Sequence, residues 1–87
     1  MAGPSKPKLE QRTRRAAEEI GGALRQARLA AGVSQERLAA RIGMTRGNLA
    51  RIEQGQTNVT LDSILRIATG LELKMNVTFR IRRKHGP

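Results

Sequence analysis

The side chains best suited to molecular recognition lie between Ser34 and Gly55, in the segment SQERLAARIGMTRGNLARIEQG. Arg46 and Arg51 fall in a short helical pattern whose apolar members, Leu49 and Ile52, must face a core, so both arginines face outward. A guanidinium group donates two parallel hydrogen bonds to O6 and N7 of guanine. The chemistry open to these residues is hydrogen bonding to a base edge or to a phosphate, or contact with water alone.

No catalytic or metal-binding pattern accompanies them. The chain has no cysteine, its only histidine is His85 in the basic C-terminal tail, and its carboxylates are scattered over helix ends and faces. Serines and threonines stand where helices begin and act as caps. We therefore expect no enzyme activity, no metal, no cofactor and no small-molecule ligand.

Two short helices must position the arginines. Ser34 and Thr45 are good N-caps, because a hydroxyl oxygen accepts a hydrogen bond from an amide in the first turn. Gly43 and Gly55 follow the two apolar stripes and end the helices. The expected helices are Gln35–Ile42 and Arg46–Gln54, and the glycine turn between them makes a helix-turn-helix pattern.

This pattern resembles the lambda-repressor-like (Xre/Cro-type) family of bacterial and phage DNA-binding proteins. Gln35 opens the first helix, Ala39 is the small residue where the helices cross, and Met44 is the apolar plug after Gly43. The trailing Ile-Glu-x-Gly of the family stands at residues 52–55, and the likeness extends roughly over residues 20–73.

The resemblance assigns roles to individual residues. It implies base contacts for Arg46, Gly47 and Arg51, although each arginine can also bind a phosphate or only water. Gly47 departs from the long polar residues common at its position, and it has no side chain with which to read a base. The candidate phosphate-binding residues are Gln35, Thr45, Asn48, Gln56, Thr57 and Asn58. Asn48 could instead contact adenine or only solvent, and residues 56–58 could be an ordinary polar turn. The implied structural ion pair joins Arg28 to Glu53 and fixes the recognition helix.

The flanking segments complete the domain. Residues 1–12 are expected to be a basic disordered tail, and a long helix begins at about Thr13. After the loop of residues 56–59, Thr60 caps a fourth helix. The buried face of that helix is expected to consist of Leu61, Ile64, Leu65, Ala68 and Leu71. The helix-turn-helix domain is thus expected to span residues 13–73.

Residues 74–82 alternate apolar and polar side chains, as expected of a β-strand. The apolar side is formed by Met75, Val77, Phe79 and Ile81. A lone strand is not stable, so we expect it to pair with its copy in a homodimer; the alternative is a frayed amphipathic tail. Residues 83–87 form a second basic tail.

The net charge of +10 is large for 87 residues. Residues 16–72 carry only +1, so the surplus lies at the two ends. This distribution favours a polyanion such as double-stranded DNA, through release of counterions. No signal peptide or apolar membrane segment is apparent, and we expect a cytoplasmic, nucleoid-associated protein.

The predicted fold is an all-α, lambda-repressor-like domain of four to five helices with one C-terminal strand that pairs across a dimer. The predicted function is a sequence-specific transcriptional regulator, a repressor that binds an inverted-repeat operator as a homodimer. Residues 58–79 also resemble HipB-type antitoxins, which leaves open a plain repressor or the antitoxin of a toxin protein. A protein-binding adaptor without DNA specificity and RNA binding through the tails are the alternatives.

Overall fold

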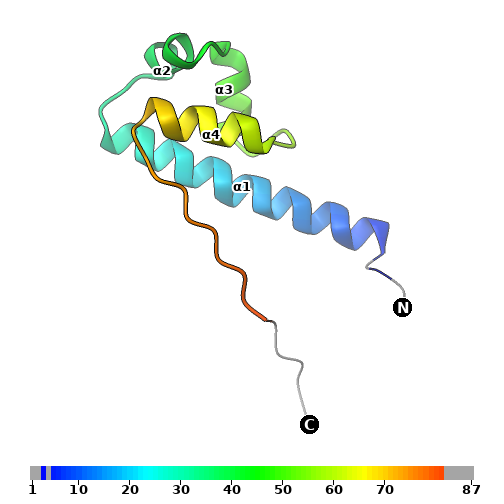
Figure 1. The fold of residues 1–87 in the computed structure, drawn as a ribbon. Helices are drawn as coiled ribbons and strands as arrows, with labels where there is room; N and C mark the ends of the chain where they lie inside the picture. The colour runs from blue at the N-terminus through cyan, green and yellow to red at the C-terminus, as the bar shows by residue number, and fades with distance from the viewer. Residues whose placement is uncertain (1–2, 4, 82–87) are drawn as a thin grey trace.

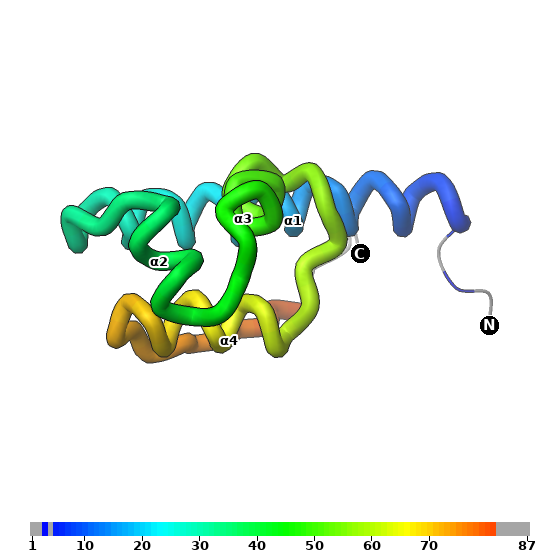
Figure 2. The backbone as a smooth tube through the Cα atoms, turned by 90° about the horizontal axis from the view of Figure 1, so that it is seen from above, coloured from blue at the N-terminus to red at the C-terminus, as the bar shows by residue number. Residues whose placement is uncertain are grey.

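The computed structural model describes residue 3 and residues 5–81, which form four α-helices (Figure 1). They are α1 (Lys6–Ala30), α2 (Gln35–Ile42), α3 (Arg46–Glu53) and α4 (Leu61–Gly70). The long helix α1 underlies the others, α3 stands almost perpendicular to it, and α2 and α4 complete the bundle at one end (Figure 2). This is the helix-turn-helix architecture predicted from the sequence.

Polar caps define where the helices begin. The hydroxyl oxygens of Ser34, Thr45 and Thr60 accept hydrogen bonds from the amides of the third residue beyond each, at 3.1 Å in all three cases. The three predicted N-caps are therefore confirmed. Ser5 caps α1 in the same way, through a 3.4 Å bond from the amide of Lys8.

The C-termini of the four helices share one backbone hydrogen-bonding pattern. In each, one residue with positive φ is followed by an amide that donates to a carbonyl five residues earlier, as in Met44 N to Ala39 O (2.9 Å). The left-handed residue is a glycine after the first three helices, as at Gly43 (φ 69°). After α4 it is Glu72 (φ 58°), which lies two residues beyond Gly70, the last residue of that helix.

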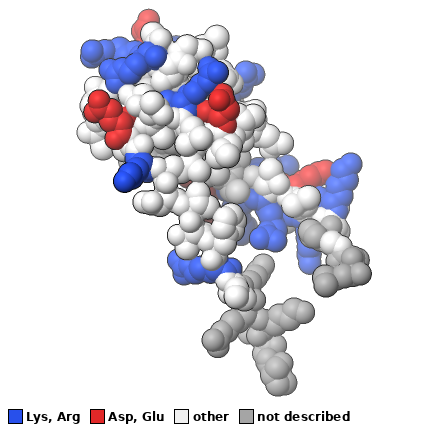
Figure 3. Space-filling view, viewed as in Figure 1, with Lys and Arg blue, Asp and Glu red and all other residues white. Residues whose placement is uncertain are grey.

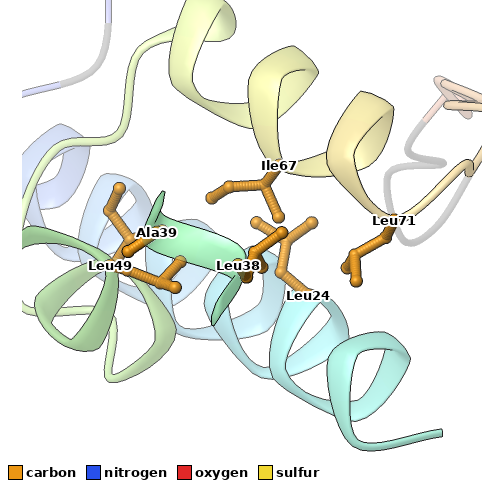
Figure 4. Packing of buried hydrophobic residues seen from close by; sticks show 7 residues of the cluster. Leu24, Leu38, Ala39, Leu49, Ile67 and Leu71 are labelled. Carbon is orange, nitrogen blue, oxygen red and sulfur yellow. The ribbon is translucent and has the colours of Figure 1, made fainter. Parts of the chain in front are cut away.

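The core lies where the four helices meet (Figure 4). It is aliphatic, and its buried members are Leu24, Leu38, Ala39, Leu49, Ile52, Ile67 and Leu71. α3 packs against α1 and α2, and α2 packs against α4. The core positions of α3, Leu49 and Ile52, are those predicted from its periodicity.

Two expectations for the flanking helices are wrong. α1 begins at Lys6, so residues 6–12 are helical and not a disordered tail, because Ser5 caps a helix that Pro7 enters in its first turn. On α4, Leu61 and Leu65 are 61% and 45% exposed, whereas Ile67 is fully buried. The other predicted members of this face agree better with the structure, because Ala68 and Leu71 are buried and Ile64 is half-buried. The buried face of α4 is therefore shifted toward Ile67 and away from Leu61 and Leu65.

The C-terminal segment, residues 73–81, is extended and leads away from the bundle (Figure 1). Within residues 5–81 it has no sheet partner, so the pairing of this segment stays a prediction. Residue 82, at the end of the expected strand, and the expected basic tail of residues 83–87 lie outside the described residues.

Two adjacent glycines of α1 have opposite surroundings. A Cβ atom on Gly21 would collide with the backbone carbonyl oxygen of Ile52, whereas one on Gly22 would meet nothing within 4 Å. α1 and the end of α3 thus touch backbone to backbone at Gly21. The position of α3 depends on this close approach.

Gly21→Ala is expected to lower the free energy of unfolding by about 1–3 kcal/mol, because backbone of α3 must move to admit the methyl group. The matched variant Gly22→Ala is expected to raise it by about 1 kcal/mol, since alanine favours a helix and the site is open. Urea unfolding followed by circular dichroism measures both. Equal effects of the two substitutions would contradict the close contact.

Candidate nucleic-acid interface

The turn between α2 and α3 consists of Gly43, Met44 and Thr45, and each of them has its own structural role. Gly43 reverses the chain with positive φ, and Met44 follows half-buried against the core. Thr45 then starts α3, and its hydroxyl oxygen is occupied by the amide of Asn48. The hydroxyl hydrogen of the exposed Thr45 remains available to donate to an anion.

The outer face of α3 carries the residues predicted to contact bases. Leu49 and Ile52 are buried, which turns Arg46, Gly47 and Arg51 toward solvent, where all three are exposed. A Cβ on Gly47 would meet nothing within 4 Å, so the backbone of α3 is uncovered there. The helix therefore presents two guanidinium groups to solvent, with the uncovered backbone of Gly47 between them.

The residues predicted to bind phosphates fall into two groups. Thr45 and Asn48 line one open groove with Arg51, together with Asp62, Ser63 and Arg66 from α4. The loop residues Gln56, Thr57 and Asn58 line another groove, beside the N-terminal half of α1. The structure thus places candidate phosphate contacts at both ends of α3.

Gln35 belongs to neither group. It is half-buried at the start of α2, and its amide nitrogen donates to Oε1 of Glu53 at 3.0 Å. This donor group binds inside the protein, a contact that the sequence analysis did not anticipate. Gln35 helps to hold α3 whether or not it also approaches a phosphate.

Ser63 and Arg66 were not identified from the sequence. They belong to α4, and folding brings them to the groove that Asn48 and Arg51 line. The guanidinium of Arg66 also pairs with Asp62 one turn earlier (2.9 Å), and both side chains are exposed. No local signal marks these residues, because only the packing of α4 brings them near α3.

Arg28 and Glu53 form the ion pair that ties α1 to α3. Arg28 Nε donates to Glu53 Oε2 (2.7 Å) and Nη2 to Oε1 (3.0 Å), with side chains only 8% and 1% exposed. Arg28 Nη1 also donates to the carbonyl of Val33 (2.8 Å). Among the described residues, no buried side-chain nitrogen or oxygen lacks a partner.

The protonation of the pair follows from these contacts. Burial of the Glu53 carboxylate favours its neutral form, but hydrogen bonds from Arg28 and Gln35 and the charges of Arg28 and Arg25 outweigh this effect, so the pKa of Glu53 lies below its ordinary value. The hydrogen bond to Glu53 raises the pKa of Arg28, against the effect of burial. Both residues are charged at neutral pH.

Within residue 3 and residues 5–81, no three acidic or histidine side chains are grouped so that they could hold a metal ion. No helix in that part of the chain has both the length and the apolar character needed to cross a bilayer.

Glu53→Gln is expected to lower the free energy of unfolding by about 3 kcal/mol, because it leaves the charge of Arg28 buried without a counterion. Asp62→Asn removes a carboxylate from the exposed pair with Arg66 and is expected to cost less than about 1 kcal/mol. Urea unfolding of the two variants makes the comparison. Similar losses would show that the buried pair does not stabilise the fold more than an exposed one.

The buried ion pair also predicts how the free energy of unfolding depends on pH, and Glu53→Gln is the variant that tests it. The folded pKa of Glu53 is below its ordinary value of 4.5, so between these two values the unfolded chain binds the extra proton and stability rises with pH. The contribution is complete above pH 4.5 and is lost as the pH falls through the folded pKa. The difference in unfolding free energy between the wild type and Glu53→Gln should therefore shrink on acidification, and a constant difference would contradict the assignment.

Comparison with known proteins supports the architecture. The sequence profile of the helix-turn-helix domain family matches residues 19–76, which is more than half of the chain. The crystal structure of the restriction-modification controller protein C.AhdI from Aeromonas hydrophila is similar, with 41% sequence identity and a TM-score of 0.65. That alignment covers 68% of this chain and 89% of the controller's chain. A search of curated proteins gave no significant match. On this evidence, the chain belongs to the lambda-repressor-like helix-turn-helix family of DNA-binding regulators.

Proposed function

We propose that the protein is a sequence-specific transcriptional regulator that binds an inverted-repeat operator as a homodimer. The observation that carries this proposal is the exposed outer face of α3, which the Arg28–Glu53 pair holds rigidly against α1. Such a helix enters the major groove, where base edges are distinguishable. In a symmetric dimer, two copies of α3 would meet successive major grooves about 34 Å apart.

Arg46 is the proposed principal base reader. It begins α3, it is exposed, and the N-terminal part of a recognition helix is the part that contacts base edges. Its guanidinium can take both acceptors of a guanine. Arg51, one turn and a half later, is assigned to a base or a phosphate. The open backbone at Gly47 lets the helix approach the DNA closely.

Phosphates on either side of the groove would be bound by the two groups of polar residues. Thr45 and Asn48 lie at the start of α3, where unpaired amides and the helix dipole also favour an anion. Gln56, Thr57 and Asn58 lie beyond its end. These contacts set the position of α3 in the groove, and the arginines supply sequence preference.

The C-terminal segment is the proposed dimer contact. The side chains of Met75, Val77, Phe79 and Ile81 are exposed in the single chain, and Phe79 is 92% exposed. Antiparallel pairing with the same segment of a second copy would satisfy its backbone groups and cover this apolar side. The exposed Leu61 and Leu65 on α4 offer further apolar surface for the same contact.

The 41% identity with a restriction-modification controller protein favours a role in the regulation of restriction-modification genes. The antitoxin role stays a prediction, and it requires a toxin protein that binds the dimer. Purification of this protein through an affinity tag, together with untagged proteins expressed from the neighbouring genes, would separate the two roles. A stable complex with a toxin supports the antitoxin, whereas neighbouring methyltransferase and endonuclease genes support the controller.

Arg46→Ala is expected to cost about 1–3 kcal/mol of binding to the operator and to relax the preference at one base pair per half-site. Arg46→Lys keeps the charge but loses the two-pronged donor, so it should lose discrimination while keeping most affinity for random DNA. Selection from random duplexes followed by fluorescence anisotropy measures both. An equal loss on operator and random DNA would remove Arg46 as a base reader, and failure to enrich any sequence would favour the adaptor.

Phe79→Lys is expected to weaken the dimer, because it places a charge in the proposed apolar contact. Thr78→Lys adds the same charge to the polar side of the segment and should have little effect. Sedimentation equilibrium at micromolar concentrations measures the dissociation constants. A monomeric wild type, or equal effects of the two lysines, would overturn the proposed pairing.

A further inference from the structure

An open groove separates α3 from α4. Its α3 side is formed by Thr45, Asn48 and Arg51, which follow one another at intervals of three residues and therefore lie in one row along the helix. All three are residues to which the proposed function assigns a DNA contact. The α4 side of the groove contains Arg66, an exposed cation to which neither the core nor the proposed function assigns a role.

Different elements lie beside the two flanks of α3. On one flank, Glu53 accepts hydrogen bonds from Arg28 of α1 and from Gln35 at the start of α2. On the other flank, Asn48 and Arg51 lie beside α4. When a helix lies in the major groove, one phosphate backbone passes on each side of it. The α4 flank therefore faces a different backbone from the flank beside α2.

The lining of the groove suits an anion better than a protein. Among the described residues that line it, Met44 has the only apolar side chain, and the others carry hydroxyl, amide, guanidinium or carboxylate groups. A protein interface needs an apolar centre, which this groove does not offer. The same residues include two cations, Arg51 and Arg66, against one acid, Asp62, so the groove has a surplus of positive charge.

Asp62, one turn earlier in α4, keeps the guanidinium of Arg66 beside the groove. Arg66 Nε lies 2.9 Å from Asp62 Oδ2, and both residues line the groove. Basic and acidic side chains lie next to each other on the upper part of the bundle in Figure 3, where Figure 1 shows α2 and α4. The side chains of Arg66 and Asp62 are 53% and 74% exposed, so an external anion can reach them. A guanidinium has more N–H donors than one carboxylate accepts, so Arg66 can bind an anion and keep Asp62.

We propose that Arg66 binds a phosphate of the DNA backbone on the α4 side of α3, so that the duplex lies across the groove between these two helices. This inference rests on the proposed function, because it takes the position of the duplex from the contacts of α3. Arg66 approaches the backbone beside Asn48 and Arg51, opposite the flank that Gln35 supports. Because phosphates are the same at every base step, the contact adds affinity without changing sequence preference.

The test compares Arg66→Gln with Arg12→Gln, which removes the same charge from a hollow lined only by residues between 3 and 19. Binding to the selected operator is measured between about 50 and 200 mM salt. Arg66→Gln should make the logarithmic salt dependence shallower by about 0.9 per subunit, and it should weaken binding to operator and random duplex by a similar factor. Arg12→Gln should change the salt dependence much less. Equal changes in the two variants, or a wild-type salt dependence in Arg66→Gln, would overturn the proposal.

Ethylation of individual phosphates locates the contact. In each half-site, the wild type should bind poorly when a particular phosphate on the α4 side of α3 is ethylated, whereas Arg66→Gln should be insensitive to ethylation at that position. Arg12→Gln should keep the wild-type pattern. The same pattern of interference in the wild type and in Arg66→Gln would show that Arg66 contacts no phosphate.

Urea unfolding separates a DNA contact from a structural role. Arg66→Gln and Asp62→Asn break the same exposed ion pair, so both should unfold at nearly the urea concentration of the wild type. A large loss of stability confined to Arg66→Gln would assign Arg66 to the fold and would count against the proposal.

Failure of this inference is distinguishable from failure of the proposed function. If the wild type enriches an operator and Arg66→Gln keeps the wild-type salt dependence, only the assignment of Arg66 falls. If the wild type enriches no sequence, the proposed function falls, and the salt dependence of the same variants on random duplex still reports whether Arg66 binds a phosphate.

Discussion

The buried pair of Arg28 and Glu53 is the interaction on which the rest of the structure depends. It joins the end of α1 to the end of α3, and Arg28 and Gln35 extend it to Val33 and to the start of α2. The small aliphatic core fixes how deeply α3 is buried, but apolar contacts are not directional. The hydrogen bonds add direction, because each accepts only a narrow range of geometry. The outer face of α3 is therefore presented in one orientation.

Close backbone contacts supply the second constraint on α3. Gly21 meets the carbonyl of Ile52, and Gly55 meets the backbone of Glu18, so α1 touches α3 and its following loop without intervening side chains. Gly70 makes a similar contact between α4 and side chains of α2. A domain with one aromatic residue achieves dense packing in this way, by bringing helices together where no side chain is present.

Local signals predicted the part of the fold that depends on local chemistry. The caps at Ser34, Thr45 and Thr60 and the inward side of α3 follow from residue type and helical spacing, and the structure agrees with them. The burial of Ile67 in place of Leu61 and Leu65 and the hydrogen bond from Gln35 to Glu53 depend on tertiary contacts, which periodicity does not encode. The helical form of residues 6–12 depends on the cap at Ser5 and on Pro7 in the first turn, in a segment whose prolines, glycine and lysines are typical of a disordered tail.

The exit of the chain from α4 depends on Glu72, the one non-glycine residue with positive φ among the described residues. A residue with a Cβ has a higher energy in this left-handed conformation than glycine has, but it also has fewer other backbone conformations available. Its amide and that of Leu73 are tied to α4 by bonds of 3.0 and 2.7 Å, so the direction of the following segment is set within two residues. In a two-fold assembly built through that segment, a small rotation at this joint is doubled by symmetry. If the proposed dimer forms in this way, the backbone conformation at Glu72 would help to set the separation of the two copies of α3, and with it the spacing of the half-sites that they would fit.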